Sequence, residues 1–266
     1  MPFDDQLFAA LHDAARAAGD LALGYFRPGL ATSAAVEMKA GDSPVTIADR
    51  QADALLASRL GALAPDAAWL SEETADTPAR LRHSRLFIVD PIDGTRGFIA
   101  GDPRWTVSIA LVEHGRPVMA VLHAPALGET YGAAAGRGAW LNNARLRVSP
   151  QAALEGGKVA GPKPLAAALR ARGHSFELAE KIPSLAYRIA LVADGRLALA
   201  SDKAHEWDIA AADLIVEEAG AALVDDEGRP LRYNKANLQH GNLTAAALPI
   251  LDRLFPARRA SARTHP

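Results

Sequence analysis

Carboxylate side chains occur in three short motifs of this 266-residue chain, and each motif stands next to apolar residues. The motifs are Ser71-Glu72-Glu73, Asp90-Pro91-Ile92-Asp93-Gly94-Thr95 and Trp207-Asp208. Carboxylate and carbonyl oxygens are the ligands that hard divalent cations such as Mg²⁺ prefer. If the fold brings the motifs together, these residue types would support a metal site.

The second motif combines metal ligands with groups that can accept a phosphate. A buried strand would deliver Asp90 to its carboxyl end, and Asp93 follows closely enough for one tight turn to present both carboxylates to a common point. The backbone carbonyl of Ile92 can add another oxygen ligand. Gly94 lets the backbone approach closely, and the amides of Gly94 and Thr95 can receive a phosphate oxygen, more so if a helix begins there. The motif therefore predicts a combined metal and phosphate site.

Each motif also has an ordinary structural interpretation. Asp-Pro and Asp-Gly are common turn dipeptides. Glu72 and Glu73 could be solvated loop residues, and Asp208 stands where a helix N-cap is expected. Spacing alone does not show that the motifs meet in space.

Periodic apolar residues predict the elements that must position these motifs. Helices are predicted over residues 4–26, 46–63, 184–193 and 208–219, and strands over residues 86–89, 105–112, 117–123, 130–135, 139–148, 196–200 and 221–224. The strands 105–112 and 117–123 flank a turn and predict a hairpin. Asp49 and Asp53 lie in the first turns of the second helix, where carboxylates favour the helix dipole. Gly220 stands where the C-cap of the last helix belongs.

The character of the chain changes near Pro150. A strand-rich part with two leading helices precedes this point, and an α/β part with glycine- and proline-rich punctuation follows it. We therefore expect two domains, residues 1–150 with most of the acidic motifs and residues 151–266 supplying Asp208.

Composition excludes several classes of function. The chain has no cysteine, so disulfides, thiolate metal sites and a cysteine nucleophile are excluded. The formal net charge of −2 provides no field for a nucleic acid polymer or an anionic membrane. No apolar run reaches the roughly 20 residues of a membrane span, and the N-terminus lacks the features of a secretory signal. We expect a cytoplasmic protein, with residues 257–266 as a frayed basic tail.

The three motifs, together with residues 207–211 and 218–220, resemble the inositol monophosphatase superfamily in order and spacing, over about residues 5–255. The resemblance implies a layered αβαβα sandwich and phosphomonoester hydrolysis by water that two or three Mg²⁺ ions activate. It implies metal ligation by Glu72, Asp90, the backbone carbonyl of Ile92, Asp93 and Asp208. A homodimer is the expected assembly.

The same resemblance assigns roles to other residues. Thr95 and Asp49 are implied to orient and deprotonate the attacking water, because residues 44–49 match an early segment of the family. Glu73 is expected to support the site or face solvent, and Trp207 to pack. The implied substrate-binding residues are Glu72, Ile92, Asp93, Gly94, Thr95 and Asp208.

Within the superfamily, residues 42–46, 94–99 and 105–111 are most similar to the bacterial 3′(2′),5′-bisphosphate nucleotidase branch. Such an enzyme removes the 3′-phosphate of adenosine 3′,5′-bisphosphate, takes part in sulfate assimilation and is sensitive to lithium. The chain departs from the branch at Arg96-Gly97, often Lys-Glu, and at Pro183, often glycine. An arginine after Asp-Gly-Thr also resembles histidinol phosphatases, so histidinol phosphate and inositol phosphate stay as alternative substrates.

Further residues are candidates to bind a second phosphate or a base, although residues of these types are more often ordinary surface or core residues. They are Lys203, His205, Arg188, Lys235, His240 and Tyr187. An inactive metal- or nucleotide-binding regulatory domain is the alternative outside enzymes. It would be expected to have lost an acidic ligand or the motif threonine, and this chain has kept all of them.

Overall fold

The first two helices form where apolar residues recur at helical spacing, and each has a side-chain N-cap. In the computed structural model, which describes residues 4–39 and 41–256, α1 is Asp5–Leu23 and α2 is Ile47–Leu63. The Asp4 carboxylate caps α1 by accepting a hydrogen bond from the Leu7 amide at 2.9 Å. Thr46 caps α2. Both predicted helices are confirmed.

A seven-stranded sheet follows in the order β3-β4-β5-β6-β7-β8-β9. Its strands are β3 (Ala68–Ser71), β4 (Arg85–Asp93), β5 (Thr106–Glu113), β6 (Arg116–Ala124), β7 (Glu129–Ala134), β8 (Gly138–Leu141) and β9 (Ala144–Leu146). Strands β3 and β4 are parallel, and β5 and β6 form the predicted hairpin. The apolar run in β4 is continuous because Leu86 and Ile88 pack on one face of the sheet while Phe87 and Val89 pack on the other.

A second, five-stranded sheet has the order β11-β10-β12-β14-β13. Its strands are β10 (Lys158–Ala160), β11 (Glu177–Leu178), β12 (Leu199–His205), β13 (Ala221–Val224) and β14 (Gln239–Ala247). The strand predicted at 196–200 starts later and runs to His205. Arg196 lies before it, and its guanidinium forms ion pairs with Glu129 and Asp194.

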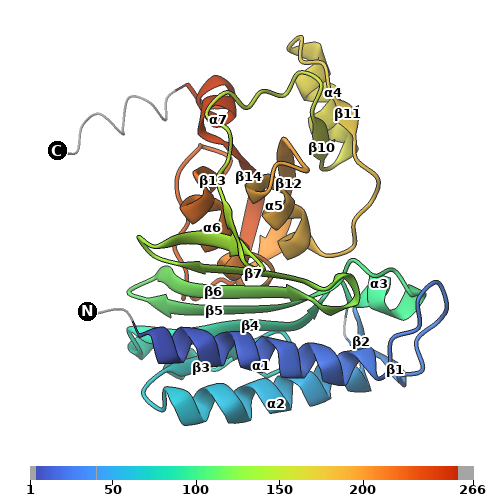
Figure 1. Ribbon diagram of the computed structural model, residues 1–266, viewed down its shortest axis with the longest axis vertical. Helices are drawn as coiled ribbons and strands as arrows, with labels where there is room; N and C mark the ends of the chain where they lie inside the picture. The colour runs from blue at the N-terminus through green and yellow to red at the C-terminus, as the bar shows by residue number, and fades with distance from the viewer. Residues whose placement is uncertain (1–3, 40, 257–266) are drawn as a thin grey trace.

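Helices and sheets alternate in layers (Figure 1). Helices α1 and α2 cover one face of the seven-stranded sheet, and α5 (Leu185–Ala193) and α6 (Glu206–Ala219) lie between the two sheets. Helices α4 (Lys163–Ala171) and α7 (Leu248–Leu254) cover the outer face of the five-stranded sheet. The expected αβαβα sandwich is confirmed.

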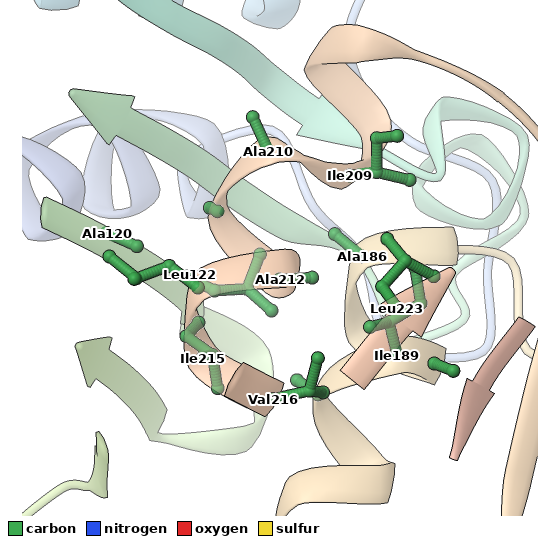
Figure 2. Packing of buried hydrophobic residues seen from close by; sticks show 14 of the residues in the cluster. Ala120, Leu122, Ala186, Ile189, Ile209, Ala210, Ala212, Ile215, Val216 and Leu223 are labelled. Atoms are coloured by element: carbon green, nitrogen blue, oxygen red, sulfur yellow. The ribbon is translucent and has the colours of Figure 1, made fainter. Parts of the chain in front are cut away.

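The hydrophobic core fills the spaces between these layers. Figure 2 shows the middle layer, where Ile215 of α6, Ile189 of α5 and Leu122 of β6 belong to one buried cluster. Helix α6 is apolar around most of its circumference because it packs against both sheets. It ends at Gly220, whose positive φ of 96° confirms the predicted C-cap.

Several smaller elements lie next to the acidic motifs. They are the hairpin of β1 (Val36–Met38) and β2 (Pro44–Thr46) and the helix α3 (Thr95–Ala100), none of which was predicted as an element. The remaining short helices of the fold are η1 (Pro78–Arg82) and η2 (Pro125–Leu127). Helix α3 begins directly after β4, which meets the condition set above for phosphate-accepting amides. The basic tail proposed for residues 257–266 lies outside the described residues.

The two sheets come from different parts of the chain, one from residues 68–146 and the other from residues 158–247. The two-domain division near Pro150 stays a prediction. Within the described residues, no helix combines the length and apolar character needed to cross a membrane.

Candidate active site

Three of the predicted metal ligands meet at one point of the fold. Glu72 directly follows β3, Asp90 lies in β4, and Asp208 lies in the first turn of α6. Each offers one carboxylate oxygen, and these oxygens lie within 4.8 Å of one another. Strands β3 and β4 run parallel in register, so both deliver their acidic residue to the same edge of the sheet.

The geometry of α6 explains how Asp208 reaches this point. The helix begins at Glu206 rather than Asp208, so the expectation that Asp208 is the N-cap is wrong. Asp208 is the third residue of the helix, and its Oδ2 accepts a hydrogen bond from the backbone amide of His205 at 2.7 Å. Trp207 packs against the core and its ring stacks on that of His205.

Asp93 borders the cluster and has its own partners. Its Oδ2 accepts hydrogen bonds from the Ser184 hydroxyl at 2.5 Å and from the Ala186 amide at 2.7 Å. Burial raises the pKa of Asp93 to about 6, although these bonds oppose the shift. Its negative charge also helps to raise the pKa of Asp90 and of Asp208, after the larger effect of burial.

The acidic cluster has the properties of a cation site. Oδ2 of Asp90 is buried without a hydrogen-bond partner among the described residues. Burial and the nearby carboxylates raise the pKa of Asp90 well above its ordinary value. An unpartnered buried carboxylate is costly unless a cation neutralises it. Because all the donors are oxygens, the residues present fit Mg²⁺.

Lys39 supplies a positive charge at the rim of this cluster. It follows β1, and its Nζ lies 2.8 Å from Oε1 of Glu72 and 2.9 Å from Oε1 of Glu73. The Glu73 side chain is only 4% exposed, so Glu73 is a buried ion-pair partner and not a solvated residue. The β1–β2 hairpin is thereby tied to the loop that carries Glu72.

Thr95 and Asp49, which are distant in sequence, contact each other. The Thr95 hydroxyl lies 3.1 Å from Oδ1 of Asp49 and 3.0 Å from the carbonyl oxygen of Ile92, and it can donate to either. Oδ2 of Asp49 accepts hydrogen bonds from the amide and hydroxyl of Thr46, at 2.8 and 2.5 Å. Burial raises the pKa of Asp49 despite these bonds.

Gly94 connects β4 to α3 in a conformation that suits glycine. Its φ is 93°, and a Cβ atom at this position would lie 2.9 Å from the backbone nitrogen of Ser184. The first amides of α3 have no carbonyl partner within the helix. The turn therefore brings amide donors next to the acidic cluster.

A pocket of about 400 Å³ opens beside this turn. Glu72, Gly94 and Thr95 line it on the side of the acidic cluster. The rest of its lining is formed by Ser43, Pro44, Arg96, Gly97, Ala100, Asp102, Lys181 and Pro183. The amides of this turn and the pocket are thus contiguous.

The other candidate residues lie outside this lining. Tyr187 is 3% exposed and its hydroxyl donates to Glu129, so it belongs to the core. Arg188 pairs with Asp202 at 3.0 Å. Lys235 and His240 line a separate pocket, and Lys203 is exposed.

Three residues that position the site were given no role in it from the sequence. Ser184 holds Asp93 and also caps α5 by accepting the Tyr187 amide at 2.9 Å. A serine before a helical apolar pattern is an N-cap signal, which could have drawn attention to Ser184. Asp53 accepts the Ser71 hydroxyl at 2.5 Å and so fixes the Glu72 loop. No local pattern marks Lys39.

Comparisons with known proteins agree with this geometry. The model of the inositol monophosphatase family matches residues 4–260. The histidinol-phosphatase of Chlorobaculum parvum is 37% identical over 222 residues, covering 81% of this chain and 84% of that protein. The 3′(2′),5′-bisphosphate nucleotidase CysQ of Escherichia coli is 35% identical over 213 residues, covering 74% of this chain and 82% of that protein.

Solved structures show the same fold. The IMPase of Thermotoga maritima superimposes with a TM-score of 0.78 at 29% identity, covering 96% of this chain and 97% of that chain. Because the family model spans nearly the whole chain and the relatives align over most of their length, the chain belongs to the inositol monophosphatase family.

Proposed function

We propose that the protein is a magnesium-dependent phosphatase that removes the 3′-phosphate of adenosine 3′,5′-bisphosphate, giving AMP and phosphate. Family membership assigns the reaction class, which is hydrolysis of small phosphorylated substrates. The observation that carries the substrate is the pocket beside the acidic cluster, whose lining includes Arg96 and Lys181. Two cations in this lining suit a leaving group that has an anionic group of its own.

Glu72, Asp90, Asp93, Asp208 and the carbonyl of Ile92 would hold the metal. When bound, Mg²⁺ would neutralise charge on the phosphate and favour deprotonation of water. The unpartnered Oδ2 of Asp90 supports this assignment.

Thr95 and Asp49 are suited to orient the water and to take its proton. The Thr95 hydroxyl can accept a hydrogen bond from water while it donates to Asp49. Because burial raises the pKa of Asp49, this carboxylate is a better proton acceptor than an exposed aspartate. Its fixed hydrogen bonds to Thr46 keep Oδ1 directed at Thr95.

The reaction is an in-line displacement at phosphorus. The oxygen of water forms a bond to phosphorus as the bond to the 3′-oxygen breaks; one proton of water passes to Asp49, which later releases it to solvent, and the leaving 3′-oxygen takes up a proton from solvent. The amides of Gly94 and Thr95 would donate to the phosphate oxygens, whose charge is spread during transfer. No covalent phosphoenzyme is needed.

Phosphate release from three esters tests the proposal. The purified protein is assayed with adenosine 3′,5′-bisphosphate, inositol 1-phosphate and histidinol phosphate, with Mg²⁺ and with EDTA. We expect the highest kcat/KM for the bisphosphate, loss of activity in EDTA and inhibition by lithium. Activity that survives chelation would overturn the metal assignment, and a preference for inositol 1-phosphate would overturn the substrate.

Histidinol phosphate is the second candidate, because a histidinol-phosphatase is 37% identical to the chain. Its amino and imidazole groups would face Arg96 and Lys181, which repel cations. An Arg96→Gln variant separates the two substrates. It should lower kcat/KM for the bisphosphate and leave it equal or higher for histidinol phosphate; the opposite pattern would favour histidinol phosphate.

A further inference from the structure

Gly97 and Pro183 are in direct contact in the lining of the pocket. A Cβ atom built on Gly97 would lie 2.4 Å from Cγ and 2.6 Å from Cβ of Pro183. Both distances are far shorter than two carbon atoms tolerate. The backbone of Gly97 is not in the left-handed region, so the proline ring, and not the backbone conformation, excludes a side chain here.

Gly97 and Pro183 are neighbours in the lining of the pocket. The two residues share one volume, because the ring of Pro183 occupies the space in which a side chain at position 97 would begin. A glutamate at position 97 could not be accommodated while Pro183 keeps its place. Gly97 and Pro183 are therefore sterically linked.

The pair also determines the chemistry of the pocket wall. Gly97, Ala100 and Pro183 present apolar surface, and proline has no backbone N–H to donate at this position. Asp102, the acid in this part of the lining, is engaged by the Arg104 guanidinium at 2.6 and 2.8 Å. Arg96 and Lys181, which are both exposed, supply positive charge to the lining of the pocket.

We propose that Gly97 and Pro183 act as one specificity-determining pair, which forms an apolar wall that favours a flat, anionic leaving group over a polyol. This deepens the proposed function and rests on it. A nucleoside can pack against a proline ring and direct its second phosphate to these cations. A polyol such as inositol needs hydrogen-bond donors and acceptors, which this wall does not offer.

The pair stands directly beside residues that hold Asp93. Pro183 precedes Ser184, whose hydroxyl donates to Asp93, and the amide of Ser184 lies against Gly94. A displacement of the proline ring would therefore move both the apolar wall and the turn at Gly94. This is the physical reason to expect an effect on kcat/KM and not on stability alone.

A double-mutant cycle tests the pair with Gly97→Ala, Pro183→Gly and the double variant. We expect Gly97→Ala to lower kcat/KM for adenosine 3′,5′-bisphosphate by about tenfold or more, because the new methyl group must displace the ring. In the Pro183→Gly background the same change should cost less than about threefold, since the clash is gone. Pro183→Gly alone should lower the ratio of bisphosphate to inositol 1-phosphate turnover.

Two additional variants separate the causes. Pro183→Ala restores the N–H but keeps Cβ, so it should improve inositol 1-phosphate turnover and, when combined with Gly97→Ala, still clash with the added methyl group. Gly61→Ala is the matched control, because a Cβ on Gly61 meets no atom within 4 Å; it should leave all rates unchanged. Thermal unfolding of each variant shows whether a loss of rate is a loss of folded protein.

The cycle also separates failure of the pair from failure of the proposed substrate. If the wild-type protein prefers inositol 1-phosphate, both the substrate and the preference assigned to the wall are wrong, whereas a preference for histidinol phosphate overturns the substrate alone and the cycle is then measured on that ester. Non-additive rates with altered substrate ratios support the pair. Additive rates, or unchanged substrate ratios in Pro183→Gly, overturn it.

Discussion

At the scale of single residues, one carboxylate in this site has two structural tasks. Oδ2 of Asp49 completes the cap of α2 through Thr46, and Oδ1 faces the Thr95 hydroxyl. First-turn helix charge and a catalytic role were alternative interpretations of the sequence. The structure permits both at once, because a carboxylate has two oxygens that can accept in different directions.

Asp93 offers the sharpest residue-scale prediction. Asp93→Asn should lower kcat at least about a hundredfold, because it removes ligand charge while an amide oxygen can still accept from Ser184 and Ala186. The thermal unfolding midpoint should stay close to that of the wild-type protein. Asp226→Asn, at an exposed acidic position, is the control and should keep full activity. A wild-type rate in Asp93→Asn would contradict the assigned site.

At the scale of elements, the site lies where the starts of four helices, α2, α3, α5 and α6, approach the carboxyl end of β4. Strand β4 carries Asp90 and Asp93, α3 begins with Thr95, Ser184 caps α5, and Asp208 is in the first turn of α6. Helix N-termini favour negative charge. This arrangement makes a cluster of buried carboxylates tolerable, and it would equally favour a phosphate.

Helix α1 provides a pH-dependent prediction away from the site. His12 packs over Gly132 of β7, and burial, followed by the charge of Arg16, lowers its pKa to about 4. The unfolded chain takes up a proton near pH 6.5, which the folded protein resists until about pH 4. The contribution of His12 to the free energy of unfolding should therefore be complete above pH 6.5 and be lost as the pH falls towards 4.

Thermal unfolding between pH 7.5 and pH 4.5 checks this expectation. As the pH falls, the midpoint of His12→Gln, which cannot gain the proton, should rise relative to the wild-type midpoint; buried acids with raised pKa values, such as Asp93, contribute an opposite slope that both proteins share. His123, whose pKa burial also lowers, keeps part of the slope in the variant. Identical slopes in the two proteins would show that His12 does not couple folding to pH.

At the scale of the whole molecule, the acidic cluster joins the two parts of the chain. Asp90 lies in the seven-stranded sheet and Glu72 directly follows its strand β3, while Asp208 belongs to the helix layer between the sheets. Arg80 reinforces this junction, because its guanidinium donates to the side-chain oxygen of Asn234 at 2.7 Å. A cation bound by all three acids would link the layers.

Magnesium should therefore stabilise the folded protein. Because Mg²⁺ would bind the assembled site and not the unfolded chain, a concentration one hundred times Kd should add about 2.7 kcal/mol to the free energy of unfolding. The unfolding midpoint should rise with MgCl₂ but not with NaCl of equal ionic strength. Asp208→Asn should lose this rise and Asp226→Asn should retain it; an equal rise in Asp208→Asn would exclude a site that needs Asp208.

Other whole-molecule predictions stay open to direct measurement. The homodimer, the cytoplasmic location and the division into residues 1–150 and 151–266 remain predictions from the sequence. Light scattering would measure the mass of the assembly, and limited proteolysis would reveal whether the chain is cut first near Pro150.

The sequence by itself determined the local chemistry. Residues 90–95 carry two carboxylates and the first amides of α3 within one turn, so these groups stand close together wherever that turn forms. The helices α1 and α2 and the hairpin β5–β6 also followed from periodicity, because each buries one regular set of apolar residues. The family resemblance placed Glu72, Asp208 and Asp49 in one site with this turn, which spacing alone could not do.

Only the tertiary structure decided which distant residues touch. The contact of Lys39 with Glu72, the hydrogen bond from Ser184 to Asp93 and the shared volume of Gly97 and Pro183 all cross between elements. Such contacts depend on how layers pack, and a shift of about one ångström weakens them while the secondary structure stays the same. No local pattern in the sequence predicts these contacts, because each residue is an ordinary one within its own segment.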